Sequence, residues 1–176
     1  MNLGLLILRV VVGLLFVGHG AQKLFGIWGG HGLQGTAGFF EAIGLRPGRF
    51  HATAAGVIEF AGGALLALGL VTPFAAAALI AVMTAAVITV HGSKGLWSTG
   101  GGYEYNLVLA AAAFALASIG AGNWSLDHAL SLSDHGVLWA VGALAVGLLG
   151  GIAAVVSGRS MARERHRGAT QRPTAA

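Results

Sequence analysis

The chain has 176 residues, of which 56% are hydrophobic and only 9% are charged. A soluble domain carries about 25% charged residues, so this composition excludes a water-facing globule and indicates that lipid surrounds the chain. The net charge is +4, but five of the ten basic residues lie between Arg159 and Arg172. A basic flank beside an apolar helix is typical of contact with anionic lipid, not with nucleic acid. The absence of cysteine excludes disulfides and thiolate chemistry within the chain.

Five apolar stretches are long enough, or nearly so, for membrane helices, which need about 20 residues. Their continuous apolar character, rich in Ala and Leu, favours helices over strands, because a helix satisfies its own backbone polar groups in hydrocarbon. The first stretch is interpreted as a retained helix and not a signal peptide, since Arg9 interrupts it and no cleavage site stands out. The predicted spans are 3–20, 52–71, 73–90, 106–121 and 137–156. The expected fold class is therefore all-α, an integral membrane helix bundle.

The segments between the spans predict how the helices connect. Pro73 directly follows Thr72, and proline at the first position of a helix predicts a tight turn, so the second and third helices should form a hairpin. The glycine-rich segments 26–35 and 92–102 are predicted loops. Residues 36–43 are too few to span and should form a short helix at the membrane interface.

Basic residues predict the orientation of the bundle. With five spans, the loops that carry Lys23, Arg46, Arg49 and Lys94 share one side with the basic tail. The positive-inside rule makes that side cytoplasmic. The C-terminal tail is therefore expected in the cytoplasm and the N-terminus outside.

Ionisable residues inside spans are costly and mark candidate functional sites. Arg9, His19 and Lys23 share one face of the first helix, and Glu59 lies about two turns into the second, at 3.6 residues per turn. A carboxylate at this depth needs a cation, and we expect that cation to come from the first helix. Arg9 with Glu59 is one candidate ion pair, and His19 and Lys23 compete with Arg9. A purely structural role for these charges is an equal alternative.

A second candidate cluster lies at the end of the third helix and the start of the fourth. His91 and Glu104 flank a glycine-rich loop, and each sits at the helix pole that favours its charge, so a hydrogen bond between them is expected. Such a pair could exchange protons near neutral pH or could staple the loop. No metal-ligand spacing of histidines and acids supports a metal or haem site, so none is expected. The candidates for ligand binding or proton relay are His19, Lys23, Glu59, His91, Tyr103 and Glu104.

Several segments that contain these residues resemble the DoxX family of small integral membrane proteins. They include Gly-His-Gly-Ala-Gln-Lys-Leu-Phe-Gly at 18–26, Glu-Phe-Ala-Gly-Gly at 59–63 and Gly-Gly-Tyr-Glu-Tyr-Asn-Leu at 101–107. Shorter pieces match at 8–9, 35–40 and 89–91, so that the resemblance runs in order from about residue 3 to 127. It implies a four-helix membrane domain over 1–127, to which this chain adds a transmembrane helix in 128–158 and a basic tail, expected to be disordered, in 159–176.

The resemblance also implies a function linked to membrane redox processes. We expect an accessory subunit of a quinone-linked or oxidative-stress system, with a pocket for a quinone or another small molecule that is not covalently bound. The alternatives are a small-molecule or lipid transporter and a non-catalytic membrane scaffold; catalysis is left open. The expected partners are the lipid bilayer, redox proteins of the same membrane and further copies of the chain, with no nucleic acid.

Overall fold

The computed structural model describes residues 2–132 and 134–170, with side chains described as far as residue 162. In these ranges the secondary structure is entirely helical, which confirms the predicted fold class. Two short helices, α2 and α6, connect five longer ones. The helices are α1 (Asn2–Phe25), α2 (Gly32–Ala42), α3 (Gly48–Leu68), α4 (Thr72–Ala86), α5 (Glu104–Ile119), α6 (Leu126–Ala129) and α7 (Val137–Thr170).

Four helices are long and apolar enough to cross a membrane. They are α1, α3, the continuous helical segment Thr72–Lys94 that begins with α4, and the Val137–Ala162 part of α7. The remaining predicted span, 106–121, corresponds to α5, which has 16 residues and is about 24 Å long at 1.5 Å per residue. This is shorter than the roughly 30 Å hydrocarbon core, so α5 is apolar but short for a span.

The predicted connections agree with the structure, whereas three helix ends differ. α2 covers most of the predicted short helix, 36–43, but begins earlier, at Gly32, within the segment predicted to be a loop. Pro73 lies in the first turn of α4 after Gly69 ends α3 in the left-handed conformation. α4 passes into a π-helix, Val87–His91, and then a 3-10 turn, Gly92–Lys94. α7 continues to Thr170, so it extends well into the segment that we expected to be a disordered tail.

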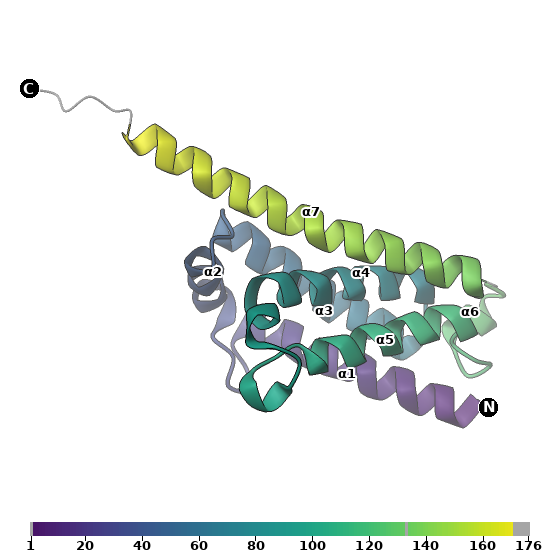
Figure 1. Cartoon of the computed structure of the whole chain (residues 1–176). Helices are drawn as coiled ribbons and strands as arrows, with labels where there is room; N and C mark the ends of the chain where they lie inside the picture. The colour runs from purple at the N-terminus through teal and green to yellow at the C-terminus, as the bar shows by residue number, and fades with distance from the viewer. Residues whose placement is uncertain (1, 133, 171–176) are drawn as a thin grey trace, which may run out of the picture.

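The long helices alternate in direction along one bundle axis. Figure 1 shows the N-terminus near α6 and the start of α7 at one end of the bundle, hereafter the α6 end. The loop after α1, α2, the loop before α5 and the far part of α7 lie toward the opposite end, hereafter the α2 end (Figure 1). The most extensive packing joins α1 with α3 and α4 with α7.

Large apolar side chains point both into the bundle and away from it. Phe16, Leu66 and Leu116 are fully buried, whereas Leu138 and Leu149 on α7 are 85% and 68% exposed. A water-soluble protein rarely exposes such a continuous apolar surface. The outer faces of the helices therefore contact the lipid bilayer.

Glycines bring α1 and α3 into backbone contact. A Cβ added at Gly13 would lie 2.5 Å from the carbonyl oxygen of Gly63, and one added at Gly20 would lie 2.5 Å from the backbone nitrogen of Phe60. Small residues at such positions let lipid-embedded helices approach closely. This contact determines which polar side chains of α1 reach α3.

We expect Gly20→Ala to destabilise the protein by about 1–3 kcal/mol, because the added methyl meets backbone atoms that cannot move independently. Gly18→Ala is the matched control, since no atom lies within 4 Å of a Cβ at that position and alanine is the better helix former. Thermal unfolding in detergent measures both. Equal melting temperatures for the two variants would contradict the close helix contact.

Candidate functional site

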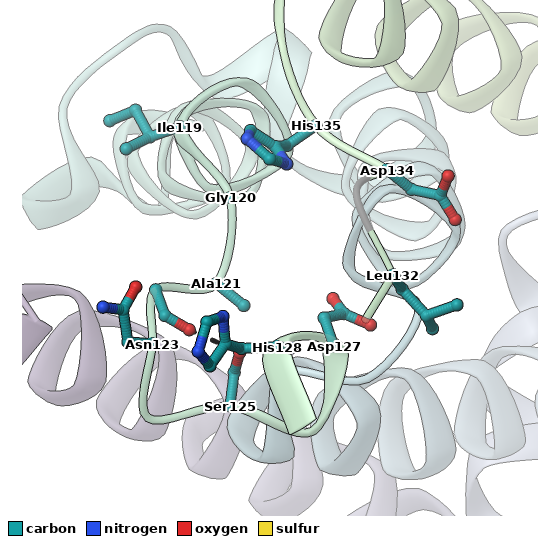
Figure 2. Close-up of a pocket in the computed structure, with 11 residues that line it drawn as sticks. Ile119, Gly120, Ala121, Asn123, Ser125, Asp127, His128, Leu132, Asp134 and His135 are labelled. Carbon is teal, nitrogen blue, oxygen red and sulfur yellow. Dashed lines mark hydrogen bonds between the residues drawn. The ribbon is translucent and has the colours of Figure 1, made fainter. Parts of the chain in front are cut away.

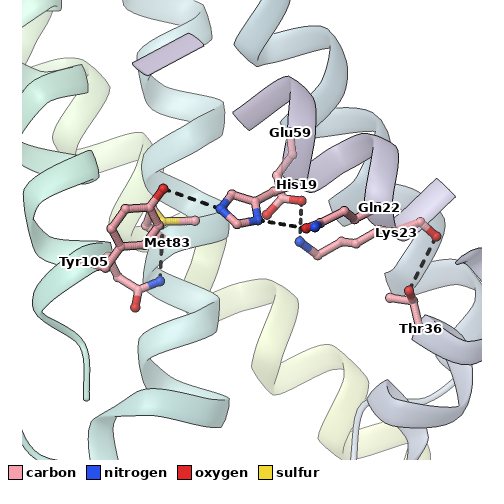
Figure 3. A network of polar contacts seen from close by, with 8 residues as sticks. His19, Gln22, Lys23, Thr36, Glu59, Met83 and Tyr105 are labelled. Carbon is pink, nitrogen blue, oxygen red and sulfur yellow. Dashed lines mark hydrogen bonds and ion pairs between the residues drawn. The ribbon is translucent and has the colours of Figure 1, made fainter. Parts of the chain in front are cut away.

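A buried ion pair joins α1 to α3 toward the α2 end. Lys23 Nζ lies 2.5 Å from Glu59 Oε2 (Figure 3). The Glu59 side chain is 3% exposed and that of Lys23 is 25% exposed, so the carboxylate depends on this cation far more than the cation depends on the carboxylate. In the structure the cation beside Glu59 is Lys23, one of the three basic residues of the first helix considered for this role.

The alternative pairing of Glu59 with Arg9 is not formed, and Arg9 instead lies toward the α6 end. Its Nη1 donates to the carbonyl oxygen of Ala121 at 3.1 Å, and its Nη2 donates to that of Trp124. Helical side chains lean toward the N-terminus of their helix, so the side chain of Arg9 points away from Glu59. Arg9 thus ties the segment after α5 to α1.

A histidine and a tyrosine extend the polar contacts from α1 to α5. His19 Nδ1 lies 3.3 Å from Gln22 Oε1, and His19 Nε2 lies 3.5 Å from the hydroxyl oxygen of Tyr105. The two rings also meet edge to face, with centroids 6.0 Å apart. Tyr105 is not among the candidates derived from the sequence, because its proximity to His19 arises from helix packing between segments 86 residues apart.

A cavity of about 300 Å³ opens beside this network, between α1, the following loop and α2. Lys23 and His19 contribute polar groups to its wall, and Thr36 donates to the backbone carbonyl of Lys23 at 3.4 Å (Figure 3). Phe39 and Phe40 of α2 contribute aromatic rings. The lining residues are His19, Gln22, Lys23, Gly29, Gly30, His31, Thr36, Phe39 and Phe40.

His91 and Glu104 lie at the two ends of the loop before α5, as expected, but they do not bond to each other. His91 Nδ1 lies 2.8 Å from the carbonyl oxygen of Gly101. Glu104 accepts hydrogen bonds from the backbone nitrogen of Ser98 at 3.0 Å and from its hydroxyl at 2.8 Å. Both side chains therefore stabilise the loop through bonds to residues within it. Tyr103 does not line the cavity between α1 and α2 but a separate, apolar cavity.

A second polar cluster, which sequence reasoning missed, lies at the α6 end. Asp127 accepts from the backbone nitrogens of Val71, at 2.6 Å, and Thr72, at 3.1 Å, and from the Thr72 hydroxyl at 2.5 Å. The carboxylate thereby caps α4, where the helix dipole favours negative charge. Asp127 also lies near enough to Arg9 to offset part of its buried positive charge.

Asp127 borders a small cavity of about 150 Å³ (Figure 2). His128, Asp134 and His135 also line it. Within the described ranges, no group of three histidine, aspartate or glutamate side chains is arranged to hold a metal ion. The hydrogen bonds of Asp127 are already made to α4, so this cluster serves the connection between helices.

Comparison with known proteins places the chain in a family. The profile described as DoxX matches residues 4–92, which include Lys23, Glu59 and all residues that line the cavity between α1 and α2. The chain belongs to the DoxX family. The match ends before the loop and α5, so Tyr103, Glu104 and Tyr105 lie outside it. No solved structure matches the chain significantly.

Two relatives cover most of this DoxX-family chain. "Uncharacterized membrane protein Rv3486" of Mycobacterium tuberculosis is 32% identical in an alignment 134 residues long that covers 70% of this chain and 79% of the relative. "Putative oxidoreductase CatD" of Bacillus subtilis is 33% identical over 115 residues, which are 65% of this chain and 79% of the relative. The protein is therefore a DoxX-family membrane protein with several spanning helices.

Proposed function

We propose that this protein is an accessory subunit of a membrane redox system, quinone-linked or active in oxidative stress, and that it binds a quinone-like small molecule between α1 and α2. The observation that carries the proposal is the Lys23–Glu59 ion pair at the wall of a cavity that also presents His19. The name of the Bacillus subtilis relative, which calls that protein an oxidoreductase, supports the same class.

The residues present fit the headgroup of a quinone. Such a group has an aromatic-sized apolar ring and carbonyl oxygens that accept hydrogen bonds. Lys23 carries three N–H donors and His19 can donate or accept, while Phe39 and Phe40 supply apolar ring surfaces. Small-molecule sites typically combine an apolar wall with a few convergent polar groups.

His19 is the residue suited to hold or pass on a proton in this cavity, because each nitrogen of an imidazole can serve as a donor or an acceptor. Its two ring nitrogens face Gln22 on α1 and Tyr105 on α5, which fix the orientation of the ring. Glu59 holds Lys23 at the cavity wall. This arrangement serves ligand binding and orientation whether or not the chain itself catalyses a redox step.

We expect His19→Phe and Phe39→Ala to weaken binding of a short-chain quinone analogue by about tenfold or more, which corresponds to about 1.4 kcal/mol. Quenching of tryptophan fluorescence in nanodiscs measures the affinity. His128→Phe, which alters the cavity at the α6 end, is the matched control and should bind like the parent. Equal affinity for all variants would reject this pocket.

The two alternative functions, a transporter and a membrane scaffold, predict different experimental results. Counterflow of a small molecule in protein-containing liposomes, with no effect on a quinol pool, would favour a transporter. Capture of redox proteins or of a second copy, with no ligand bound by any variant, would favour a scaffold. The proposed role as a redox subunit requires that the protein both binds the ligand and associates with a redox partner protein.

We further propose that the α2 end faces the cytoplasm. Arg46, Arg49 in the first turn of α3, and Lys94 belong to segments that lie toward this end with the far part of α7 (Figure 1). Positive residues favour the cytoplasmic side. We expect reporter fusions to show an external N-terminus and a cytoplasmic C-terminus. Reporters that place both termini on one side would contradict this orientation.

A further inference from the structure

An apolar cavity that involves neither α1 nor α2 has no role in the function proposed above. It measures about 380 Å³, lies between α4, α5 and α7, and is lined almost entirely by apolar atoms. Water is disfavoured there, because the walls offer almost no hydrogen-bonding partners.

The shape of the cavity follows from small residues on two helices. Gly147 and Gly151 bring α7 against α4, since a Cβ at either position would lie 2.5 Å from an atom of α4. Ala110 and Ala111 of α5 line the gap that remains. The cavity is therefore built by close α4–α7 contact beside a helix with short side chains.

One buried polar side chain faces this apolar space without a strong partner. Asn106 is 6% exposed and lines the cavity, and its Nδ2 donates to the thioether sulfur of Met83 at 3.4 Å. A thioether is a weak acceptor, and a buried amide without a good partner costs free energy. A ligand oxygen at this position would supply the stronger acceptor.

The depth of Asn106 indicates the class of ligand. It lies two residues after the start of α5, about 3 Å along the helix axis, where the chain passes from a glycine-rich loop into an apolar helix, as expected at the boundary between the hydrocarbon core and the polar headgroups. The ester carbonyls of phospholipids occupy this boundary. Tyr103 lies at the same end of the cavity, and Phe114 lines it two helical turns deeper.

A π-helix forms part of the cavity wall, and the chain continues from it to a basic residue. The π-helix Val87–His91 contributes Val87 and Ile88 to the wall, and π-helical turns are frequent at functional sites. The segment continues directly to Lys94, which forms no ion pair among the residues the structure describes. A lipid phosphate would meet a basic side chain on this loop.

We propose that the cavity between α4, α5 and α7 binds one bilayer phospholipid, with an ester carbonyl at Asn106 and one acyl chain beside Ala111. The lipid fills the space that the short side chains leave and couples α7 to α5. This proposal does not depend on quinone binding between α1 and α2, because the two cavities share no lining residue.

The test measures the phospholipid that remains bound after extraction in polymer nanodiscs and extended detergent washing. We expect the parent to retain phospholipid and Ala111→Phe, which fills the cavity, to retain about tenfold less. Val108→Phe is the matched control, because Val108 is 59% exposed on the same helix and does not line the cavity. Equal retention by the two variants would overturn the proposal.

A phospholipid with a photoreactive group in its acyl chain locates the site without relying on a variant that must fold. Labelling is expected on α5 peptides that contain Ala110 to Phe114 and on the facing part of α7. Labelling spread evenly over all helices would overturn the proposal, as would recovery of an isoprenoid lipid in place of phospholipid. Quinone-analogue binding by Ala111→Phe should equal that of the parent, which separates the two proposals.

Discussion

Lys23→Met is expected to destabilise the protein by about 3–5 kcal/mol, the usual cost of removing one partner of a buried ion pair. The variant leaves the Glu59 carboxylate, which is 3% exposed, with its charge uncompensated. Glu59→Gln should lower the free energy of unfolding by less, about 1.5–3 kcal/mol. The Lys23 ammonium that it leaves without a partner borders the cavity and is 25% exposed. The free energy of unfolding in detergent measures both effects.

The double variant Lys23→Met/Glu59→Leu tests whether the cost arises from the uncompensated charge. It removes both charged groups and should recover most of the stability lost in Lys23→Met, since apolar replacement of a buried pair is often neutral or stabilising. Simple addition of the single effects would show that the two side chains do not interact. A Glu59→Gln variant less stable than Lys23→Met would contradict the asymmetry in burial.

Asp127→Ala is expected to destabilise the protein by about 3 kcal/mol or more. It removes the cap of α4, worth about 0.5–2 kcal/mol, and leaves Arg9 without the nearby negative charge. It also deprives the backbone nitrogens of Val71 and Thr72 of their acceptor. Hydrogen bonds to charged groups contribute about 1.5–3 kcal/mol each, so the combined loss should be large.

Asp134→Ala is the matched control for Asp127→Ala. Asp134 lines the same small cavity but does not cap α4. The melting temperature of Asp134→Ala should therefore stay close to that of the parent protein. Asp127→Asn should fall between the two, because the amide oxygen still accepts one hydrogen bond without the charge. An Asp127→Ala variant as stable as Asp134→Ala would contradict the capping role.

The helical class, the turn before Pro73 and the short helix α2 could be predicted because each follows from local composition. The length of α7 could not, since the basic segment after residue 158 is polar yet continues the helix to Thr170. Helix propensity of arginine and alanine favours such a continuation. The start of the tail was predicted from its basic residues alone, but basic residues do not end a helix.

The candidate site was predictable in its residue types but not in its pairings. The sequence placed Arg9, His19 and Lys23 on one face of α1. Which of them meets Glu59 depends on how α1 is aligned along α3, and the glycine contacts between the two helices bring Lys23 to Glu59. Sequence also placed His91 and Glu104 beside one loop, but each found a closer partner within that loop.

The contacts of Asp127 and Tyr105 could not be anticipated from spacing, because both depend on tertiary packing. Asp127 reaches a helix that begins 55 residues earlier in the chain, and Tyr105 reaches His19 across 86 residues. No local pattern at either residue distinguishes it from a loop acid or an interfacial aromatic residue. Only the fold shows that they join separate helices.

The central claim is that the cavity between α1 and α2 binds a quinone-like molecule beside the Lys23–Glu59 pair. An experimental structure of the protein extracted from its native membrane without detergent tests this claim most directly. We expect density for a flat headgroup within hydrogen-bonding distance of Lys23 or His19 and in contact with Phe39. A cavity that contains only ordered water, or one closed by Phe39 against Lys23, would contradict the claim.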